Sequence, residues 1–206
     1  MQSETARIEA FSDGVFAIAI TLLILEIKVP RQDQGSLAVA LLRQWPSYLA
    51  FLMSFTYIGV MWINHHRMFT HIKRSDDVLL LLNLLLLLGV TVVPFPTAVL
   101  AQFLNHPDQK MAAVVYNATF IVIAVFFNVL WRYAVSHHLL DKTVSAAAAE
   151  NISRQYAYGP LLYLVCLALA WINVRASIAA NISLALYFAL PPSLLRKRSA
   201  SPYPGS

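Results

Sequence analysis

The chain has 206 residues, of which 59% are hydrophobic and only 12% are charged, and its mean hydropathy is +0.63. A soluble domain rarely has so few charges, and long apolar runs recur along the whole sequence, which predicts an integral membrane protein. The formal net charge of +5 would suit a nucleic-acid-binding protein, but basic residues of a membrane protein usually mark its cytoplasmic side. We therefore expect the lipid bilayer as a partner and no nucleic acid. The single cysteine, Cys166, lies in an apolar run and excludes a disulfide within the chain.

Six segments are long and apolar enough, or nearly so, to span a bilayer, which takes roughly 20 residues. In chain order they are 5–27, 45–69, 78–103, 111–134, 156–173 and 176–190, and the last two are short. The run SLAVALLRQWP favours an interfacial helix broken at Pro46, and Pro94 and Pro96 predict that the third span kinks or ends near one membrane face. The flanks of the first span do not resemble a cleavable signal peptide. The fold class is thus an all-α polytopic membrane protein with six transmembrane helices.

The basic residues predict the orientation of these helices. With a cytoplasmic N-terminus, ten lysines and arginines lie in the inside segments and five in the outside segments. This difference favours cytoplasmic N- and C-termini. We expect one transmembrane domain, 1–195, followed by a basic, Ser/Pro-rich cytoplasmic tail, 196–206.

Polar residues gather at the cytoplasmic third of the first three spans. Asp13 lies about 12 Å along the first helix at 1.5 Å per residue, and a carboxylate at that depth needs a partner because it is costly in lipid. The second span returns to the cytoplasm through MWINHHRMFTH, and the third begins after Asp77, so the topology brings polar side chains of three helices to one level. These are Ser12, Asp13, Trp62, Asn64, His65, His66 and Asn83.

Two interpretations of this group remain open. The side chains either lock three helices together by hydrogen bonds, or they relay protons or bind a metal. Adjacent histidines on a helix point about 100° apart, and the sequence has neither HExxH nor a Cys/His ligand set. The structural interpretation is therefore favoured over a proton relay or a metal site.

The first helix also carries an apolar face that excludes Asp13. Gly14, Ile18, Thr21, Leu22 and Leu25 fall within one sector of a helical wheel. Such a face is ordinarily used for packing or lipid contact, and its periodicity alone does not assign it.

The run RIEAFSDGVFAIAITLLILEI resembles the signature of the transmembrane protein 175 family of potassium channels. The family's R-x-x-x-F-S-D motif is present as Arg7, Phe11, Ser12 and Asp13, and WINHH and NLLLLLGVTVVPFPT resemble its second and third helices. The resemblance implies a homotetramer of six-helix subunits in the cell membrane, with the first helices around a central pore. It implies that Arg7, Phe11, Ser12 and Asp13 hold the first helix against the second and third. It further implies a hydrophobic constriction at Ile18, Leu22 and Leu25, with the hydroxyl of Thr21 facing the pore.

A potassium-selective channel is therefore the expected function, with potassium as the permeant ion and no cofactor or other metal. The backbone-carbonyl TVGYG filter is absent from the sequence. Glu26 either attracts cations at the pore mouth or pairs with Lys28 or Arg31. The alternative function is a proton-conducting or proton-coupled transporter that uses Asp13 and His65 or His66. A membrane enzyme is disfavoured because no nucleophile or metal constellation is present.

Overall fold

The structure is a computed structural model, and it describes residues 5–31 and 36–189. This part of the chain is helical throughout, apart from its connections and an isolated bridge between Ile72 and Leu140. The elements in chain order are α1 (Ala6–Leu22), η1 (Leu23–Glu26), α2 (Leu37–Arg43), α3 (Trp45–His71), α4 (Asp77–Val92), α5 (Pro94–Phe103), α6 (Gln109–Ser136), α7 (Ala146–Ile172) and α8 (Val174–Ala189). The all-α prediction is confirmed. The expected tail, 196–206, lies outside the described residues.

Five helical segments in the described part of the chain are long and apolar enough to cross a membrane. They are Ala6–Glu26, Trp45–His71, Asp77–Phe103, Gln109–Ser136 and Ala146–Ile172. The sixth expected span corresponds to α8, which has 16 residues and so a length of about 24 Å against a hydrocarbon core of about 30 Å.

Proline positions explain where two helices begin. The third expected span divides into α4 and α5 at Pro94, as predicted, because proline cannot donate to the preceding turn. The expected break at Pro46 is wrong: α2 ends at Arg43, and Pro46 lies in the first turn of α3. A proline is tolerated in that turn because its missing N–H would have no helical partner.

Helix α7 begins at Ala146, well before the expected start at residue 156. Hydropathy misses this segment because it contains Glu150, Arg154 and other polar residues. The alanines that follow Ser145 are strong helix formers, and the hydroxyl of Ser145 caps the helix by accepting the N–H of Ala148 at 3.2 Å.

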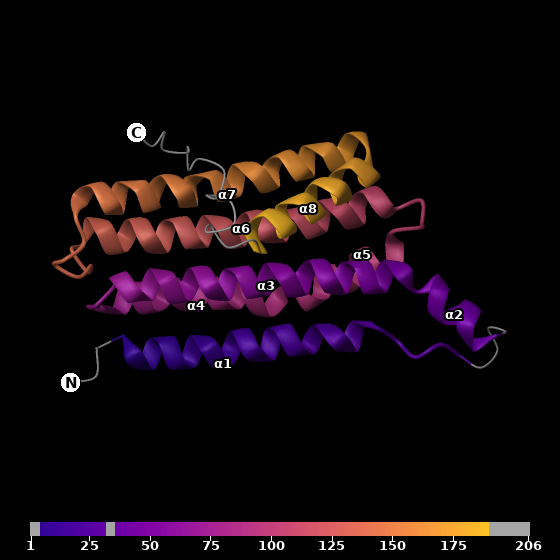
Figure 1. The fold of residues 1–206 in the computed structure, drawn as a ribbon, viewed down its shortest axis with the longest axis horizontal. Coiled ribbons are helices and arrows are strands. Elements are labelled where there is room, and N and C mark those ends of the chain that lie inside the picture. Colours follow the sequence, from indigo (N-terminus) through magenta and orange to yellow (C-terminus); the bar gives the residue numbers. More distant parts are fainter. Residues whose placement is uncertain (1–4, 32–35, 190–206) are drawn as a thin grey trace, which may run out of the picture.

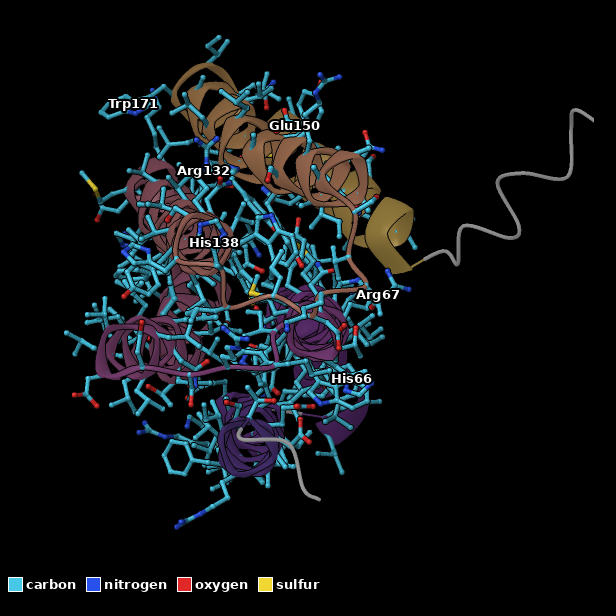
Figure 2. The ribbon with its side chains drawn as sticks, turned by 90° about the vertical axis from the view of Figure 1, so that its left-hand side faces the viewer. His66, Arg67, Arg132, His138, Glu150 and Trp171 are labelled. Carbon is cyan, nitrogen blue, oxygen red and sulfur yellow. The ribbon has the colours of Figure 1, made fainter. Side chains whose placement is uncertain are left out.

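The long helices run side by side along one axis, and their ends form two ends of the bundle (Figure 1). We call the end that contains the α3–α4 connection the Asp76 end, and the end that contains the α5–α6 connection the His106 end. Figure 2 looks onto the Asp76 end, where Arg67, Arg132 and His138 lie. In both views α1 lies at the edge of the bundle, with no described helix on its outer side.

Two connections are joined at the Asp76 end. The backbone N–H of Lys73 donates to the carbonyl of Leu139 at 3.0 Å, and that of Asp141 donates to His71 at 2.8 Å. Asp76 caps α4 by accepting the N–H of Leu79 at 2.8 Å. The first two bonds hold the end of α3 and the residues that follow it against the connection between α6 and α7.

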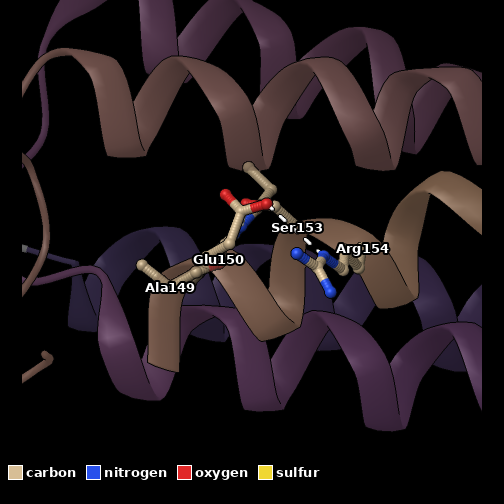
Figure 3. A network of polar contacts seen from close by, with 5 residues as sticks. Ala149, Glu150, Ser153 and Arg154 are labelled. Carbon is tan, nitrogen blue, oxygen red and sulfur yellow. Dashed lines mark hydrogen bonds and ion pairs between the residues drawn. The ribbon is translucent and has the colours of Figure 1, made fainter. Parts of the chain in front are cut away.

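Helices α6 and α7 are fastened by polar side chains near the same end. The indole of Trp131 donates to Ser153 at 2.9 Å, and the Ser153 hydroxyl donates to the carbonyl of Ala149 at 2.8 Å. One residue further along α7, Glu150 and Arg154 form an exposed ion pair at 3.6 Å (Figure 3). An exposed pair of this kind contributes little, so the buried indole and the apolar contacts around it hold the two helices together.

Candidate functional site

Helix α1 has one face in the bundle and one face outside it. Its buried side chains recur at three- and four-residue spacing and pack against α3 and α4; they are Ile8, Ser12, Phe16, Ala19 and Leu23. This is the spacing of a single helical face. Ser12 lies on this buried face and Asp13 lies beside it. Ile18, Leu22 and Leu25 lie on the face of α1 that is outside the bundle.

A chain of three buried polar side chains joins α1, α3 and α4. The amide Nδ2 of Asn83 donates to the hydroxyl of Ser12 at 3.1 Å, and its Oδ1 lies 2.9 Å from Nε2 of His65. All three side chains are almost fully buried. Buried polar groups are costly without partners, so this chain specifies how α1 sits in the groove between α3 and α4.

Two aromatic residues that sequence reasoning missed hold the ring of His65. The ring centroid of Phe16 on α1 lies 5.4 Å from that of His65. The ring of Phe69 stacks on the imidazole of His65, with centroids 4.5 Å apart. The signal was available, because Phe16 follows Ser12 by one helical turn on the same face. These rings fix the imidazole so that Nε2 points at Asn83.

Asp13 has a separate partner nearer the surface of the subunit. The indole Nε1–H of Trp62 donates to Asp13 Oδ1 at 2.9 Å. The ring of His66 stacks on that indole, with centroids 6.3 Å apart. All three side chains are exposed within the subunit. In the described residues, neither histidine bonds directly to Asp13.

The set of residues that meet inside the subunit is therefore smaller than expected. Arg7 and Phe11 are exposed because they share the helical sector of Gly14 and Ile18, at intervals of four, three and four residues. Asn64 contributes its backbone carbonyl, which accepts the hydroxyl of Tyr156 at 3.3 Å, while its side chain has no hydrogen bond within the described residues. Asn64 follows Trp62 by two residues, which is about 200° around the helix, so its side chain points away from α1.

The apolar face of α1 is open. Ile18 and Leu25 are each 60% exposed and Leu22 is 42% exposed, whereas the opposite face of the same helix buries Phe16, Ala19 and Leu23. A methyl group added at Gly14 would meet nothing within 4 Å. Packing inside the subunit thus gives no reason for the glycine, and the face is free for contacts outside it.

Thr21 lies on the same open face. Its hydroxyl is 2.9 Å from the carbonyls of Ala17 and Ile18, to which it donates within its own helix. The hydroxyl proton is therefore used, and the oxygen lone pairs remain available on the open side.

Glu26, at the end of η1, forms an ion pair with Lys28, which is one of the two arrangements expected for it. The ammonium of Lys28 lies 3.9 Å from Glu26 Oε2 and donates to the carbonyl of Leu25 at 2.6 Å. Lys28 thus satisfies a terminal carbonyl of the helix. Among the described residues, no group of three or more His, Cys, Asp or Glu side chains is arranged to hold a metal ion.

Residues 7–94, which include α1 from Arg7 onward and the whole of α3 and α4, match the family model described as endosomal/lysosomal potassium channel TMEM175. A protein named as a potassium channel from Chamaesiphon minutus is 53% identical over 193 residues, covering 92% of this chain and 95% of the relative. A second, from Streptomyces collinus, is 47% identical over 90% of this chain and 92% of the relative.

A third relative differs in its name and length. The endosomal/lysosomal proton channel TMEM175 of Bos taurus is 33% identical over 207 residues, which span 93% of this chain and 43% of the bovine protein. Among solved structures, a lysosomal potassium-selective channel TMEM175 homolog from Chamaesiphon minutus superposes with a TM-score of 0.84 at 50% identity, covering 96% of this chain and 100% of that one. The chain belongs to the TMEM175 channel family.

Proposed function

We propose that the chain is the subunit of a potassium-selective channel, a homotetramer in which the α1 helices of four subunits surround a central pore. The observation that carries the proposal is the open Ile/Leu face of α1, on a helix whose opposite face is fixed to α3 and α4 by buried polar groups. One helix cannot enclose a path for an ion, so a pore on this face requires further copies. The chain is an integral membrane protein of a channel family and not an enzyme.

The proposed constriction is formed by Ile18, Leu22 and Leu25. Their side chains offer no oxygen to replace an ion's water, so a narrow ring of them gates by dewetting and favours the ion that rearranges its water at least cost. Potassium holds its water less tightly than sodium, which gives a preference for potassium without a carbonyl filter. The lone pairs of Thr21 provide polar contact beside this ring. No cofactor is needed for such a mechanism.

The proposed topology places the Asp76 end and both termini in the cytoplasm, with α8 as the sixth crossing in the plasma membrane. It is supported by the excess of lysine and arginine in the segments expected inside, including Arg67 and Arg132 at the Asp76 end. Protease added to sealed right-side-out vesicles should leave a C-terminal tag intact. Digestion of that tag would reverse the assignment.

Ion flux into liposomes tests the function directly. Purified protein should carry potassium faster than sodium when a voltage is set across the vesicle, and empty vesicles processed in the same way provide the baseline. Equal rates for both ions, or no flux above this baseline, would contradict the proposed potassium channel.

Proton conduction is the second candidate, favoured by one arrangement. The carboxylate of Asp13 is exposed, only one of its oxygens is hydrogen-bonded within the described residues, and the exposed His66 stacks on its partner Trp62. His65 is less suited because it is buried and bonded to Asn83. Asp13→Asn keeps the acceptor for Trp62 and removes the titrating group. Proton flux in the wild type that this variant abolishes would support the candidate, and its absence from the wild type would exclude it.

A further inference from the structure

A cavity of about 700 Å³ lies at the His106 end of the bundle, remote from the α1 face. Three parts of the chain form it: the first turns of α3, the α5–α6 connection, and the first half of α8. Helices α3, α6 and α8 all begin at this end of the bundle (Figure 1). The cavity has no part in the proposed pore.

The walls of the cavity are apolar toward the middle of the bundle and polar toward its end. Leu49, Ile178 and Ile182 lie one or two turns inside their helices, whereas Arg175 and His106 lie at a helix start and in a connection. The polar lining residues thus lie at the level of the helix ends, together with Trp45, Leu104 and Pro107, and the lining residues deeper in the helices are apolar. A ligand that fits both parts has a polar head and an apolar tail.

Arg175 is held in place by its backbone, which leaves its charge available. The side-chain Oδ1 of Asn173 accepts the N–H of Arg175 at 2.9 Å and that of Ala176 at 3.2 Å, capping the start of α8. The guanidinium has no hydrogen bond or ion pair within the described residues, and the residue is exposed. In the α5–α6 connection, Asp108 pairs with His106 at 3.2 Å.

Aromatic residues place the cavity mouth at the boundary of the bilayer. Trp45 lines the cavity and is 48% exposed. Trp171, at the end of α7, is also exposed, and the ammonium of Lys110 lies 5.8 Å from its ring centroid. Exposed tryptophans beside basic residues are characteristic of the headgroup level of a membrane. A small soluble ligand would leave the apolar side chains that line the cavity in contact with water.

We propose that this cavity binds one anionic phospholipid. Its phosphate lies against the guanidinium of Arg175, which matches phosphate with paired donors, and an acyl chain lies along Leu49, Ile178 and Ile182 between α3 and α8. Charge complementarity and the change from polar to apolar lining select a lipid over a small soluble anion. The site thus ties α8 to the start of α3 through a lipid.

Native mass spectrometry of the detergent-solubilised protein tests the site, with phosphatidylglycerol and phosphatidylcholine of identical acyl chains as probes. The wild type should retain phosphatidylglycerol in preference to phosphatidylcholine. Arg175→Gln should lower binding of phosphatidylglycerol about fivefold, the effect expected for one arginine at an anionic lipid surface, and should leave phosphatidylcholine nearly unchanged. Ala179→Trp, which fills the cavity from α8, should lower binding of both lipids.

The matched control is Arg43→Gln, which removes an exposed arginine at the end of α2 that does not line the cavity. An equal loss in Arg43→Gln and Arg175→Gln would overturn the proposal, because it would indicate general surface charge. Displacement of the lipid by millimolar inorganic phosphate would overturn the choice of a lipid. A change in oligomeric mass in Arg175→Gln would show instead that a second copy covers the cavity.

Discussion

Asn83 is the residue through which α4 holds both α1 and α3. It donates to Ser12 and pairs with His65, and all three side chains are removed from solvent. Asn83→Ala should therefore lower the melting temperature, because the groups left without partners cost about 1–3 kcal/mol each. Asn64→Ala removes the same amide from a side chain with no hydrogen bond in the described residues and should have little effect. Equal shifts in the two variants would refute a special role for Asn83.

Asp76 predicts a pH dependence at the cytoplasmic boundary of the proposed topology. The backbone N–H of Leu79 and the hydroxyl of Tyr133, which donates at 2.9 Å, hold the pKa of the Asp76 carboxyl below its usual value. A depressed pKa contributes stability above the unfolded-state value of about 3.9, and this stability is lost as the pH falls through the folded-state pKa. Asp76→Asn should therefore melt below the wild type at pH 7, and the difference should shrink in acid.

The neighbouring Asp77→Asn is the control for this experiment. Asp77 has the same charge in the first turn of α4 but is exposed and has no side-chain hydrogen bond in the described residues. At pH 7, Asp77→Asn should lower the melting temperature less than Asp76→Asn does. A gap between wild type and Asp76→Asn that stayed constant from neutral pH into acid would show that the carboxylate charge is not responsible.

At the scale of elements, a side chain of α6 bonds a backbone carbonyl of α7 that lacks its partner within the helix. Pro160 lies inside α7 and has no N–H for the carbonyl of Tyr156, one turn earlier. The side-chain amide of Asn128 on α6 donates to that carbonyl, and the Asn128 oxygen accepts Nε of Arg132 at 3.0 Å. Neighbouring helices often satisfy backbone groups freed by proline in this way within a bilayer.

This arrangement predicts that Asn128 and Pro160 are energetically coupled. Asn128→Leu should destabilise the wild type by about 1–3 kcal/mol, because it leaves the Tyr156 carbonyl unpaired. In a Pro160→Ala background the helix supplies its own N–H, so the same substitution should cost much less. A double-mutant cycle on melting temperature measures the coupling, and additive effects would show that Asn128 does not serve the proline.

The helical elements could largely be predicted because apolar length and proline position determine them. The starts and ends of α3 and α6 lie within a few residues of the expected spans. Hydropathy failed at the start of α7, where Ser145 and a run of alanines extend the helix into polar sequence. It also could not show that Asn128 bonds across to Tyr156, since that contact depends on the rotation of two helices against each other.

At the scale of the whole subunit, the predicted topology anticipated only part of the candidate site. Topology and depth alone brought Ser12, Trp62 and Asn83 to one level. They did not give the pairing, because Phe16 and Phe69 orient His65 toward Asn83 and away from Asp13. The exposure of Arg7 follows from the same helical wheel that groups Gly14 with Ile18.

The subunit also leaves its first helix incompletely covered. One face of α1 is packed against α3 and α4. The other face exposes Ile18, Leu22, Leu25 and Gly14, and nothing lies within 4 Å of a methyl group added at Gly14. Lipid contact would satisfy the aliphatic side chains but gives no role to Gly14. Copies of the chain arranged about a common axis give both a role, because small residues let helices approach closely.

Ion selectivity of Ile18→Asn is the most direct test that this face lines the constriction. The substitution places amide oxygens in the proposed ring with little change in volume, so the penalty that disfavours sodium should shrink. The control is Leu88→Asn on α4, because Leu88 and Ile18 are both 60% exposed. In a two-cation reversal-potential measurement, we expect relative sodium permeability to rise in Ile18→Asn while potassium current persists, with Leu88→Asn unchanged. Unaltered selectivity in Ile18→Asn, or a larger shift in Leu88→Asn, would contradict a pore lined by this face of α1.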